Sequence, residues 1–321
     1  MMKSAVVLGG AGFLGSHICD ALFEKNYQVI AIDNLSSGNV QNIKHLLHQK
    51  YFTFINQDIC LPLNVSYDVD LVFNFASLAS PPRYCLDPIG TLRAGSLGVE
   101  NAIHLALDKG ARLIHASTSE VYGDPLEHPQ HEGYWGNVNP VGDRSCYDEA
   151  KRYAEALCIA YSNTRSLDVG IVRIFNTYGP RLDPSDGRVL SNLINQALLN
   201  TDLTIYGDGS QTRSFCYVSD LIRGILNFSL IGYRGPINLG NPNEIKILDL
   251  ARIILDQTKS KSRIVFKDLP MDDPQRRCPD ISLAIKLLNW EPTVSLGTGL
   301  DSLIKWYSLG NRTLKYDNWI V

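Results

Sequence analysis

Short apolar runs rich in β-branched residues alternate with longer helical patterns through the first half of the chain. The runs lack the in/out alternation of a half-exposed strand, which is typical of strands buried on both faces of a sheet. They lie at residues 5–8, 29–32, 52–55, 71–75, 113–116 and 169–174. Helical patterns lie between them, at residues 13–25, 89–109 and 147–162. This alternation predicts an α/β fold built on a doubly wound parallel sheet of the Rossmann type.

The regular alternation ends near residue 176, where prolines and glycines mark a long loop. Helical patterns return near 189–199 and 248–257, without the earlier strand spacing. We therefore expect a dinucleotide-binding domain over residues 1–178, with return segments near 214–240. A smaller, interleaved C-terminal domain, which binds the substrate, is expected over 179–321.

Composition and charge narrow the class of protein. The 321 residues are 45% hydrophobic and carry a net charge of −3, which favours neither nucleic acid nor an acidic membrane as a partner. No stretch of 18 apolar residues occurs, so no membrane span is expected. Seven scattered cysteines form no Cys-x-x-Cys pair, which predicts free thiols and no metal site. Because the chain starts at its first predicted strand, without a leader or anchor, a cytoplasmic protein is expected.

A glycine-rich turn follows the first predicted strand and opens the first predicted helix. Gly9, Gly12 and Gly15 form Gly-x-x-Gly-x-x-Gly, with Phe13 and Leu14 at the start of the helix. Glycine permits a tight turn and close approach of a pyrophosphate, and the helix N-terminus adds free N–H donors. A glycine run alone is a weak signal, since it can also be a plain strand–helix turn.

Asp33 strengthens the dinucleotide interpretation, because it ends the second strand, 18 residues beyond Gly15. A carboxylate there accepts a hydrogen bond from a ribose 2′-OH and repels a 2′-phosphate, so NAD is favoured over NADP. The alternative is that Asp33 only caps a turn with Asn34. Other candidate cofactor residues, some of which can equally be ordinary strand-end residues, are Asn34, Ser36, Gly38, Asp58, Ile59, Ala76 and Ser77.

Two groups of residues suit proton transfer. Tyr147 and Lys151 stand four residues apart on one predicted helix, so their side chains share a face. A nearby ammonium is expected to lower the pKa of the tyrosine, which can then take a proton from a sugar hydroxyl. Thr118, Ser119 and Glu120 follow the fifth strand, where a parallel sheet places its ligands. The alternatives are an accidental pair on an exposed helix and a helix or turn cap.

The chain also carries several long motifs. They are Ser-Thr-Ser-Glu-Val-Tyr-Gly at 117–123, Arg-Ile-Phe-Asn-Thr-Tyr-Gly-Pro-Arg at 173–181 and Asp-Gly-Ser-Gln-Thr-Arg at 208–213. Together with the glycine turn and the Tyr–Lys pair, they resemble the extended short-chain dehydrogenases/reductases that act on nucleotide sugars. A finer similarity is to the UDP-glucuronate decarboxylases (UDP-xylose synthases). It rests on Ser-Pro-Pro at 80–82, Asp-Pro-Leu-Glu-His-Pro at 124–129, Tyr-Trp-Gly at 134–136, Ser-Cys-Tyr-Asp-Glu at 145–149 and Asp-Asp-Pro at 272–274.

The resemblance implies a role for each matching residue. Tyr147 would be the base and Lys151 its partner and ribose ligand, Thr118 and Ser119 would hold the sugar hydroxyl, and Glu120 would assist decarboxylation. On the substrate side, matching residues would bind the sugar carboxylate (Arg277), the sugar (Arg93), the diphosphate (Asn176 and Arg213) and the uridine (Tyr206 and the segment 189–193). The complete set of substrate candidates is Arg93, Glu120, Tyr147, Asn176, Arg181, Val189, Asn192, Leu193, Tyr206, Gln211 and Arg213.

The sequence departs from the family pattern at five positions. Leu78 stands for a proline, Gly95 for an asparagine, Asp143 for a proline, Ala150 for a glycine and Cys278 for a lysine. None of these changes removes a catalytic group.

The family implies an NAD-dependent lyase that oxidises the sugar at C4, releases CO2 and reduces C4 again. Three other activities of nucleotide-sugar enzymes with the same scaffold remain as alternatives: a 4-epimerase, a 4,6-dehydratase, and a decarboxylase that releases the 4-keto-pentose. A dehydratase is disfavoured, because Ser119 stands where that class usually has Asp. A non-catalytic sensor of NAD or nucleotide sugars is a distant alternative. The resemblance also implies a homodimer, joined in a four-helix bundle by the helices near 89–109 and 145–162, although those apolar faces also have to pack on the sheet.

Overall fold

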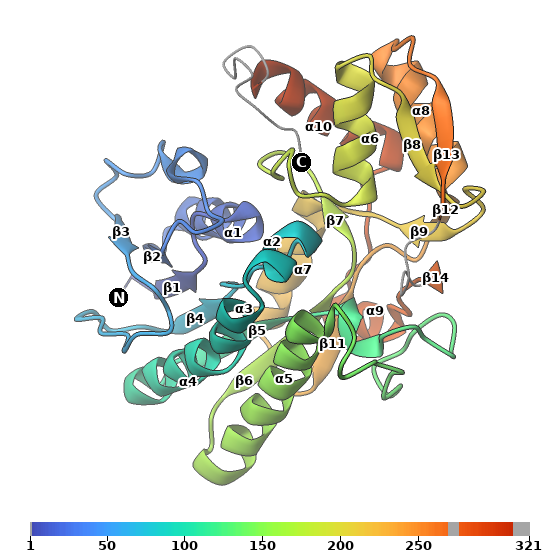
Figure 1. The fold of residues 1–321 in the computed structure, drawn as a ribbon. Helices are drawn as coiled ribbons and strands as arrows, with labels where there is room; N and C mark the ends of the chain where they lie inside the picture. The colour runs from blue at the N-terminus through green and yellow to red at the C-terminus, as the bar shows by residue number, and fades with distance from the viewer. Residues whose placement is uncertain (1, 269–275, 311–321) are drawn as a thin grey trace.

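The computed structural model describes residues 2–268 and 276–310, and its centre is a seven-stranded sheet (Figure 1). All neighbouring strands run parallel, in the order β11-β6-β5-β4-β1-β2-β3. Their bounds are β1 (Ser4–Leu8), β2 (Gln28–Asp33), β3 (Phe52–Asn56), β4 (Leu71–Asn74), β5 (Arg112–Thr118), β6 (Val169–Ile174) and β11 (Pro236–Leu239). The prediction of a doubly wound parallel sheet is therefore confirmed.

Helices cover both faces of this sheet, which explains why its strands are apolar on both sides. One face packs on α4 (Leu97–Lys109) and α5 (Ser145–Arg165), with Ala102 and Ala154 fully buried between the layers. The other face packs on α1 (Phe13–Glu24), α7 (Val218–Ser229) and α9 (Ser282–Leu288). Since α7, β11 and α9 follow the loop near 176 in sequence, the chain returns to the sheet after starting the second unit.

The second unit stands beside the carboxyl ends of the strands and has a core of its own (Figure 1). It contains α6 (Val189–Leu198), α8 (Ile247–Thr258) and α10 (Leu296–Gly310), with the parallel pair β8 (Leu203–Tyr206) and β13 (Ile264–Lys267). A three-stranded sheet in the order β12-β9-β14 lies next to it, made of β12 (Glu244–Lys246), β9 (Thr212–Ser214) and β14 (Arg276–Arg277). The short pair β7 (Thr177–Tyr178) and β10 (Cys216–Tyr217) joins the two units.

The structure corrects one element and adds others. The single helix expected over 89–109 is two helices, α3 (Pro88–Gly95) and α4, because Ser96 has φ −116° and ψ −80° and its hydroxyl donates to Leu92 O at 2.7 Å. A short helix, α2 (Pro81–Leu86), precedes them, and single 3₁₀ turns lie at η1 (Val40–Ile43) and η2 (Ser119–Tyr122). The Asp-Asp-Pro motif at 272–274 and residues 311–321 lie outside the described residues. Among those described, no helix has the length and apolarity needed to cross a membrane.

Candidate active site

A cavity of about 1520 Å³ lies between the carboxyl ends of the parallel strands and the second unit. The loops that follow β1 to β6 line one side of it, and α6, β8, β9 and β14 line the other. Small-molecule pockets commonly measure about 300–1,000 Å³. This cavity therefore has room for two ligands, at the edge of the sheet where open α/β folds bind them.

The glycine turn forms the floor of one end of the cavity. Gly9 has φ +79°, a conformation that favours glycine, and a Cβ there would lie 2.8 Å from Ala76 N. At Gly15 a Cβ would lie only 2.0 Å from Gly9 O, so the start of α1 packs directly on the turn. Gly12 precedes α1, whose first N–H groups have no acceptor within the helix. The turn thus presents free donors to an anionic group such as a pyrophosphate.

Asp33 lies at the end of β2 and holds the turn in place. Its Oδ2 accepts from Ala11 N at 3.0 Å and its Oδ1 accepts from Leu35 N at 2.8 Å. Burial raises the pKa of Asp33, and the backbone hydrogen bonds oppose this rise. Gly38 does not line the cavity; its backbone packs on Asp33, since a Cβ there would lie 2.7 Å from Asp33 Oδ1.

Asp58 and Arg93 lie together at the same end of the cavity. Asp58 accepts from Cys60 N at 2.8 Å and from Asn34 Nδ2 at 3.2 Å. The Cys60 N–H has the largest effect in holding the pKa of Asp58 below its usual value, and the positive charge of Arg93 contributes to the same shift. The structure therefore places Arg93 beside the cofactor-binding loops, where Ile59, Ala76 and Ser77 also line the cavity.

These residues fit NAD. A carboxylate ends β2, and the following segment Asn-Leu-Ser-Ser-Gly-Asn carries no basic side chain to bind a 2′-phosphate. The glycine turn leaves space that any Cβ at Gly9 or Gly15 would fill.

Tyr147 and Lys151 lie on one face of α5 and line the cavity, both nearly completely buried. Lys151 Nζ is 5.7 Å from the centroid of the Tyr147 ring and donates to Ala116 O at 2.8 Å. The ring of Tyr84 stacks on Tyr147 with centroids 5.2 Å apart.

The expected lowering of the Tyr147 pKa by Lys151 is wrong for the protein by itself. Burial, and then the negative charge of Glu120, raises the pKa of Tyr147 to about 12. Burial also lowers the pKa of Lys151 to about 8, because the ammonium has lost its water. The Thr118 hydroxyl shares a hydrogen bond with Tyr147 that favours the phenolate.

Glu120 lies in the first turn after β5, between two arginines. Arg277 donates to its Oε1, and Arg144 Nη2 donates to its Oε2 at 2.5 Å. Arg277 also donates to Gly123 O at 2.8 Å. Burial, the largest single influence, opposes ionisation of Glu120, but Arg277 and Arg144 together hold its pKa below the ordinary value. Glu120 is therefore a carboxylate with both oxygens paired, beside Ser119 at the cavity wall.

Two further charged groups surround this arrangement. Burial, and then the charge of Glu120, raises the pKa of Asp148 to about 7, and its Oδ1 has no hydrogen-bond partner among the described residues. Arg188 is paired with Asp186, and its positive charge favours the phenolate form of Tyr147.

Most substrate candidates from the second unit line the same cavity. They are Asn176, Arg181, Val189, Asn192, Tyr206, Gln211 and Arg213. Arg181 also pairs with Asp20 of α1 at 2.6 Å. Leu193 is not one of them, because it is fully buried in the core of the second unit and does not line the cavity.

Sequence reasoning missed Arg144, Tyr84 and Arg188 as site residues. Arg144 had a signal, since it directly precedes the Ser-Cys-Tyr motif at 145–147. Nothing local marks Tyr84 or Arg188, which reach the site from α2 and from the loop before α6.

Two departures from the family pattern face each other in the structure. A Cβ on Gly95 would lie 2.5 Å from the Ala150 Cβ, so α3 and α5 approach closely only because residue 95 is glycine. Leu78 packs against Tyr84, Cys146 and Tyr147. Asp143 is exposed.

A glycine turn that suits a dinucleotide, beside a buried Tyr-x-x-x-Lys pair, defines a site of the short-chain dehydrogenase/reductase type. Residues 5–231 match the NAD dependent epimerase/dehydratase family. UDP-glucuronic acid decarboxylase 1 of Danio rerio is 48% identical over 306 residues, which are 95% of this chain and 73% of that protein. UDP-glucuronic acid decarboxylase 6 of Arabidopsis thaliana is 47% identical over 92% of this chain and 86% of its own length. The chain belongs to the NAD dependent epimerase/dehydratase family and, within it, to the UDP-glucuronic acid decarboxylases.

Solved structures show the same fold. The UDP-glucuronic acid 4-epimerase from Bacillus cereus, in complex with UDP-glucuronic acid and NAD, has a TM-score of 0.86 and 29% identity, over 96% of this chain and 99% of that one. The UDP-glucose 4-epimerase from Thermotoga maritima has a TM-score of 0.87 and 27% identity, over 96% of this chain and all of that one. The cofactor of this chain is NAD, in agreement with the family and with the cavity.

Proposed function

We propose that this chain converts UDP-glucuronate to UDP-xylose and CO2, with NAD as a bound cofactor. One observation carries the proposal: Glu120, paired with Arg144 and Arg277, lies in the same cavity as the Tyr147–Lys151 pair and the glycine turn. Arginines beside the Tyr147–Lys151 pair suit a sugar that carries a carboxylate. The relatives named UDP-glucuronic acid decarboxylases support the choice of substrate.

The residues at one end of the cavity would hold the cofactor. The glycine turn and the start of α1 suit the pyrophosphate, and Asp33 suits a ribose hydroxyl. When bound, NAD would supply the hydride acceptor and donor for C4 of the sugar, and none would be consumed over the cycle.

Tyr147 would exchange the proton of the C4 hydroxyl. With a pKa raised to about 12 it is protonated in the protein by itself, so it accepts a proton only when positive charge compensates the phenolate. Lys151 and Arg188 are two cations near Tyr147, and Thr118 adds a hydrogen bond.

Glu120 and its two arginines would control the C6 carboxylate. Oxidation at C4 makes the sugar a β-keto acid, whose C5–C6 bond breaks to release CO2 and leave an enolate that is protonated at C5. A guanidinium binds a carboxylate through two parallel hydrogen bonds. Because Arg277 and Arg144 are both paired with Glu120, the substrate carboxylate competes with Glu120 for them. Glu120 released in this way is placed to exchange protons with the sugar.

The test is to incubate the purified protein with UDP-glucuronate and catalytic NAD, and to follow products by proton NMR and mass spectrometry. UDP-xylose with loss of CO2 and no net NADH is the expected result. NADH that accumulates with a 4-keto-pentose would show that the cycle stops before the last reduction. An epimerised uronate without loss of CO2 would move the chain to the activity of its structural neighbour from B. cereus. NAD and sugar binding without turnover would indicate a sensor.

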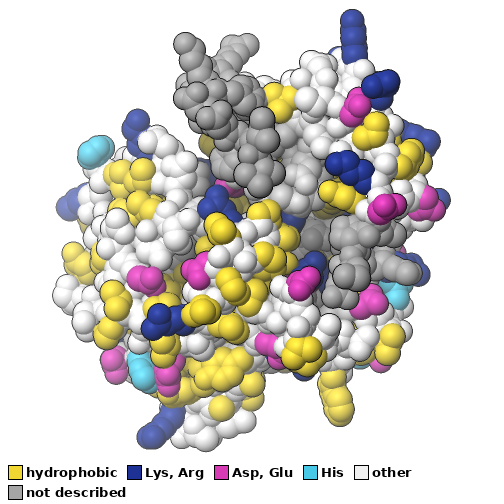
Figure 2. Space-filling model, in the orientation of Figure 1, with side chains coloured by type: hydrophobic (Ala, Val, Ile, Leu, Met, Phe, Trp, Pro, Cys, Tyr) yellow, Lys and Arg dark blue, Asp and Glu magenta, His cyan; other side chains and the backbone are white. Residues whose placement is uncertain are grey.

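We also propose a homodimer built on α4 and α5, as the family resemblance implies. Large apolar side chains are exposed on α3, α4 and α5, among them Ile89, Leu97 and Tyr153. Hydrophobic side chains gather in the lower centre of Figure 2, in the region of these helices. Light scattering at working concentration should give the mass of two chains, and Ile89→Glu, at an exposed position that does not line the cavity, should lower it. A monomer mass for the unchanged protein would contradict the dimer.

Two further proposals concern the chain as a whole. The cofactor domain comprises 1–178 with the return segments near 214–240, and the remaining residues to 321 make the nucleotide-sugar domain, except that α9 packs with the cofactor domain. A cytoplasmic location is supported by the seven cysteines, all of which are free thiols.

A further inference from the structure

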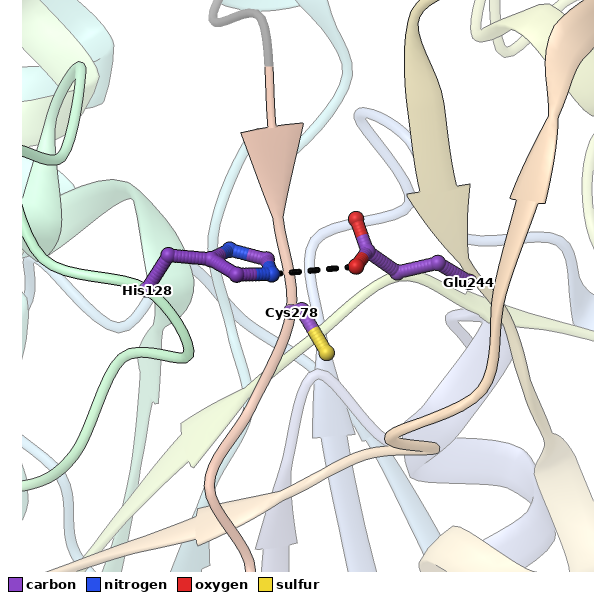
Figure 3. Close-up of side chains that lie close together, drawn as sticks. All are labelled: His128, Glu244 and Cys278. Carbon is purple, nitrogen blue, oxygen red and sulfur yellow. Dashed lines mark hydrogen bonds and ion pairs between the residues drawn. The ribbon is translucent and has the colours of Figure 1, made fainter.

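Outside the cavity, three side chains from distant parts of the chain converge (Figure 3). His128 comes from the loop after β5, Glu244 from β12, and Cys278 directly follows β14. One ligand atom from each lies within 4.8 Å of the other two, and His128 Nε2 is 3.0 Å from Glu244 Oε2. The spacing along the sequence did not reveal this group, because more than a hundred positions separate His128 from Glu244 and more than thirty separate Glu244 from Cys278.

A cation already occupies the mouth of this group. Arg276 Nη2 lies 2.8 Å from His128 Nε2 and 3.2 Å from Glu244 Oε2. One ring nitrogen cannot donate to Glu244 and also accept from Arg276, so no tautomer of His128 satisfies both contacts. With its lone pair on Nε2, His128 instead accepts from Arg276 Nη2, which also donates to Glu244 Oε2, so two acceptors face one positive charge.

The other contacts hold the ligands in place. Thr212 Oγ1 donates to Glu244 Oε1 at 2.5 Å, which orients the carboxylate. Gln130 Oε1 accepts from Cys278 N at 2.9 Å, and Cys278 Sγ donates to Pro242 O at 3.2 Å. The thiol is nearly completely buried, and the other two side chains are partly exposed, so solvent reaches one side of the group.

We propose that His128, Glu244 and Cys278 form a binding site for a divalent cation of the zinc class, which displaces the side chain of Arg276. Imidazole nitrogen, carboxylate oxygen and thiolate sulfur are the ligands that zinc prefers, and water completes a tetrahedron. Binding transfers the thiol proton to solvent, forms the metal–sulfur bond and breaks the contact with Pro242.

The distances suit such a site after small movements. Nitrogen and oxygen ligands of tetrahedral zinc lie about 3.4 Å apart, so His128 and Glu244 separate by only a few tenths of an ångström from their present distance. The sulfur has to approach by a movement on the order of 1 Å. Displacing Arg276 costs little, because more than half of its side chain is exposed and exposed ion pairs contribute little net stability.

The location ties the site to the strand that carries Arg277. Cys278 directly follows Arg277, and the Glu244 and Arg277 strands both pair with β9. A metal bound here joins β12, the loop of His128 and the residue that directly follows β14, and so fixes the backbone that follows Arg277. It is a structural site rather than a catalytic one, since none of its ligands lines the cavity.

The test uses the full chain without an affinity tag, treated with a chelator and then titrated with Co²⁺ alone. One Co²⁺ per chain with a thiolate-to-cobalt absorption band, which Zn²⁺ abolishes, is expected. Cys278→Ser should abolish the band, and His128→Ala should weaken binding at least tenfold. The matched controls Cys85→Ser and His131→Ala, in an exposed thiol and an exposed histidine outside the group, should leave both unchanged.

Arg276→Ala sharpens the test, because it removes the competing cation and should tighten Co²⁺ binding by about two- to fivefold. Zn²⁺ in excess should also raise the Tm of the unchanged protein and of Arg276→Ala, but not that of His128→Ala. The proposal is overturned if no thiolate band appears, if Cys278→Ser retains it, or if Cys85→Ser loses it. Should Cys278→Ser fail to fold, His128→Ala, at a partly exposed position, decides the question through the affinity alone.

Discussion

Arg144→Ala offers the sharpest test of how Glu120 is held. The substitution removes the partner of Glu120 Oε2 and leaves Arg277 on Oε1. Hydrogen bonds to charged groups contribute about 1.5–3 kcal/mol each. Because about 1.4 kcal/mol corresponds to a tenfold change, kcat/KM for UDP-glucuronate should fall by about 10- to 100-fold. The fall should lie in the lower part of this range, since Arg144 is partly exposed and water weakens its hydrogen bond.

The pH profile separates this role from a merely structural one. Arg277 and Arg144 hold the pKa of Glu120 down against its burial, so loss of Arg144 raises that pKa. Glu120 is then protonated at higher pH than before, and the acid limb of the kcat/KM profile should move upward. Arg144→Lys keeps the charge and should return part of the shift.

The assay is CO2 release or UDP-xylose formation between about pH 4 and 8, the range in which a carboxylate of raised pKa titrates. Arg252→Ala is the matched control, since Arg252 forms an exposed ion pair with Asp249 on α8 and neither residue lines the cavity. A fall in kcat/KM with an unmoved acid limb would show that Arg144 only supports the fold. An unchanged kcat/KM would show that the ion pair between Arg144 and Glu120 has no part in the reaction.

Three other changes test the glycine turn at Gly15, the contact between α3 and α5, and the buried carboxyl group of Asp148. Gly15→Ala places a Cβ 2.0 Å from Gly9 O, so NAD affinity measured by calorimetry should fall at least about tenfold, since backbone cannot yield cheaply; unchanged affinity would contradict this role of the glycine turn. Gly95→Ala should lower the free energy of unfolding by about 1–3 kcal/mol through overlap with Ala150, and adding Ala150→Gly should recover part of the loss in denaturant melts. Simple additivity of the two would speak against the contact. The pKa of Asp148 is raised to about 7, which means that the folded state favours its neutral carboxyl group. This group therefore stabilises the folded state fully below its unfolded pKa, and the stabilisation is lost as pH rises toward 7. Asp148→Asn should therefore match the wild-type Tm near pH 4 and exceed it above pH 7, and a constant difference across this range would refute the assignment.

Local patterns in the sequence predicted the parallel sheet, the glycine turn and the Tyr147–Lys151 pair. Each depends on neighbours only a few residues apart, whose spacing sets a turn, a helix face or a strand end. The break of the expected 89–109 helix at Ser96 did not follow from local spacing, because α3 is positioned by α5 through Gly95 and Ala150. The small sheets of the second unit could not be predicted for a different reason: their strands of two to four residues are too short to show a period.

Local sequence patterns were enough to identify the class of fold and the chemical groups that it presents: a glycine turn for a dinucleotide, an acid–base pair and a set of arginines. How these groups act on one another became clear only from the packing of the folded chain. It placed Glu120 between Arg144 and Arg277, stacked Tyr84 on Tyr147, moved Arg93 toward Asp58 and brought His128, Glu244 and Cys278 together. The physical reason is that pKa values, ion pairs and metal sites depend on distance and on loss of water, and both arise only when segments far apart in the sequence pack against each other.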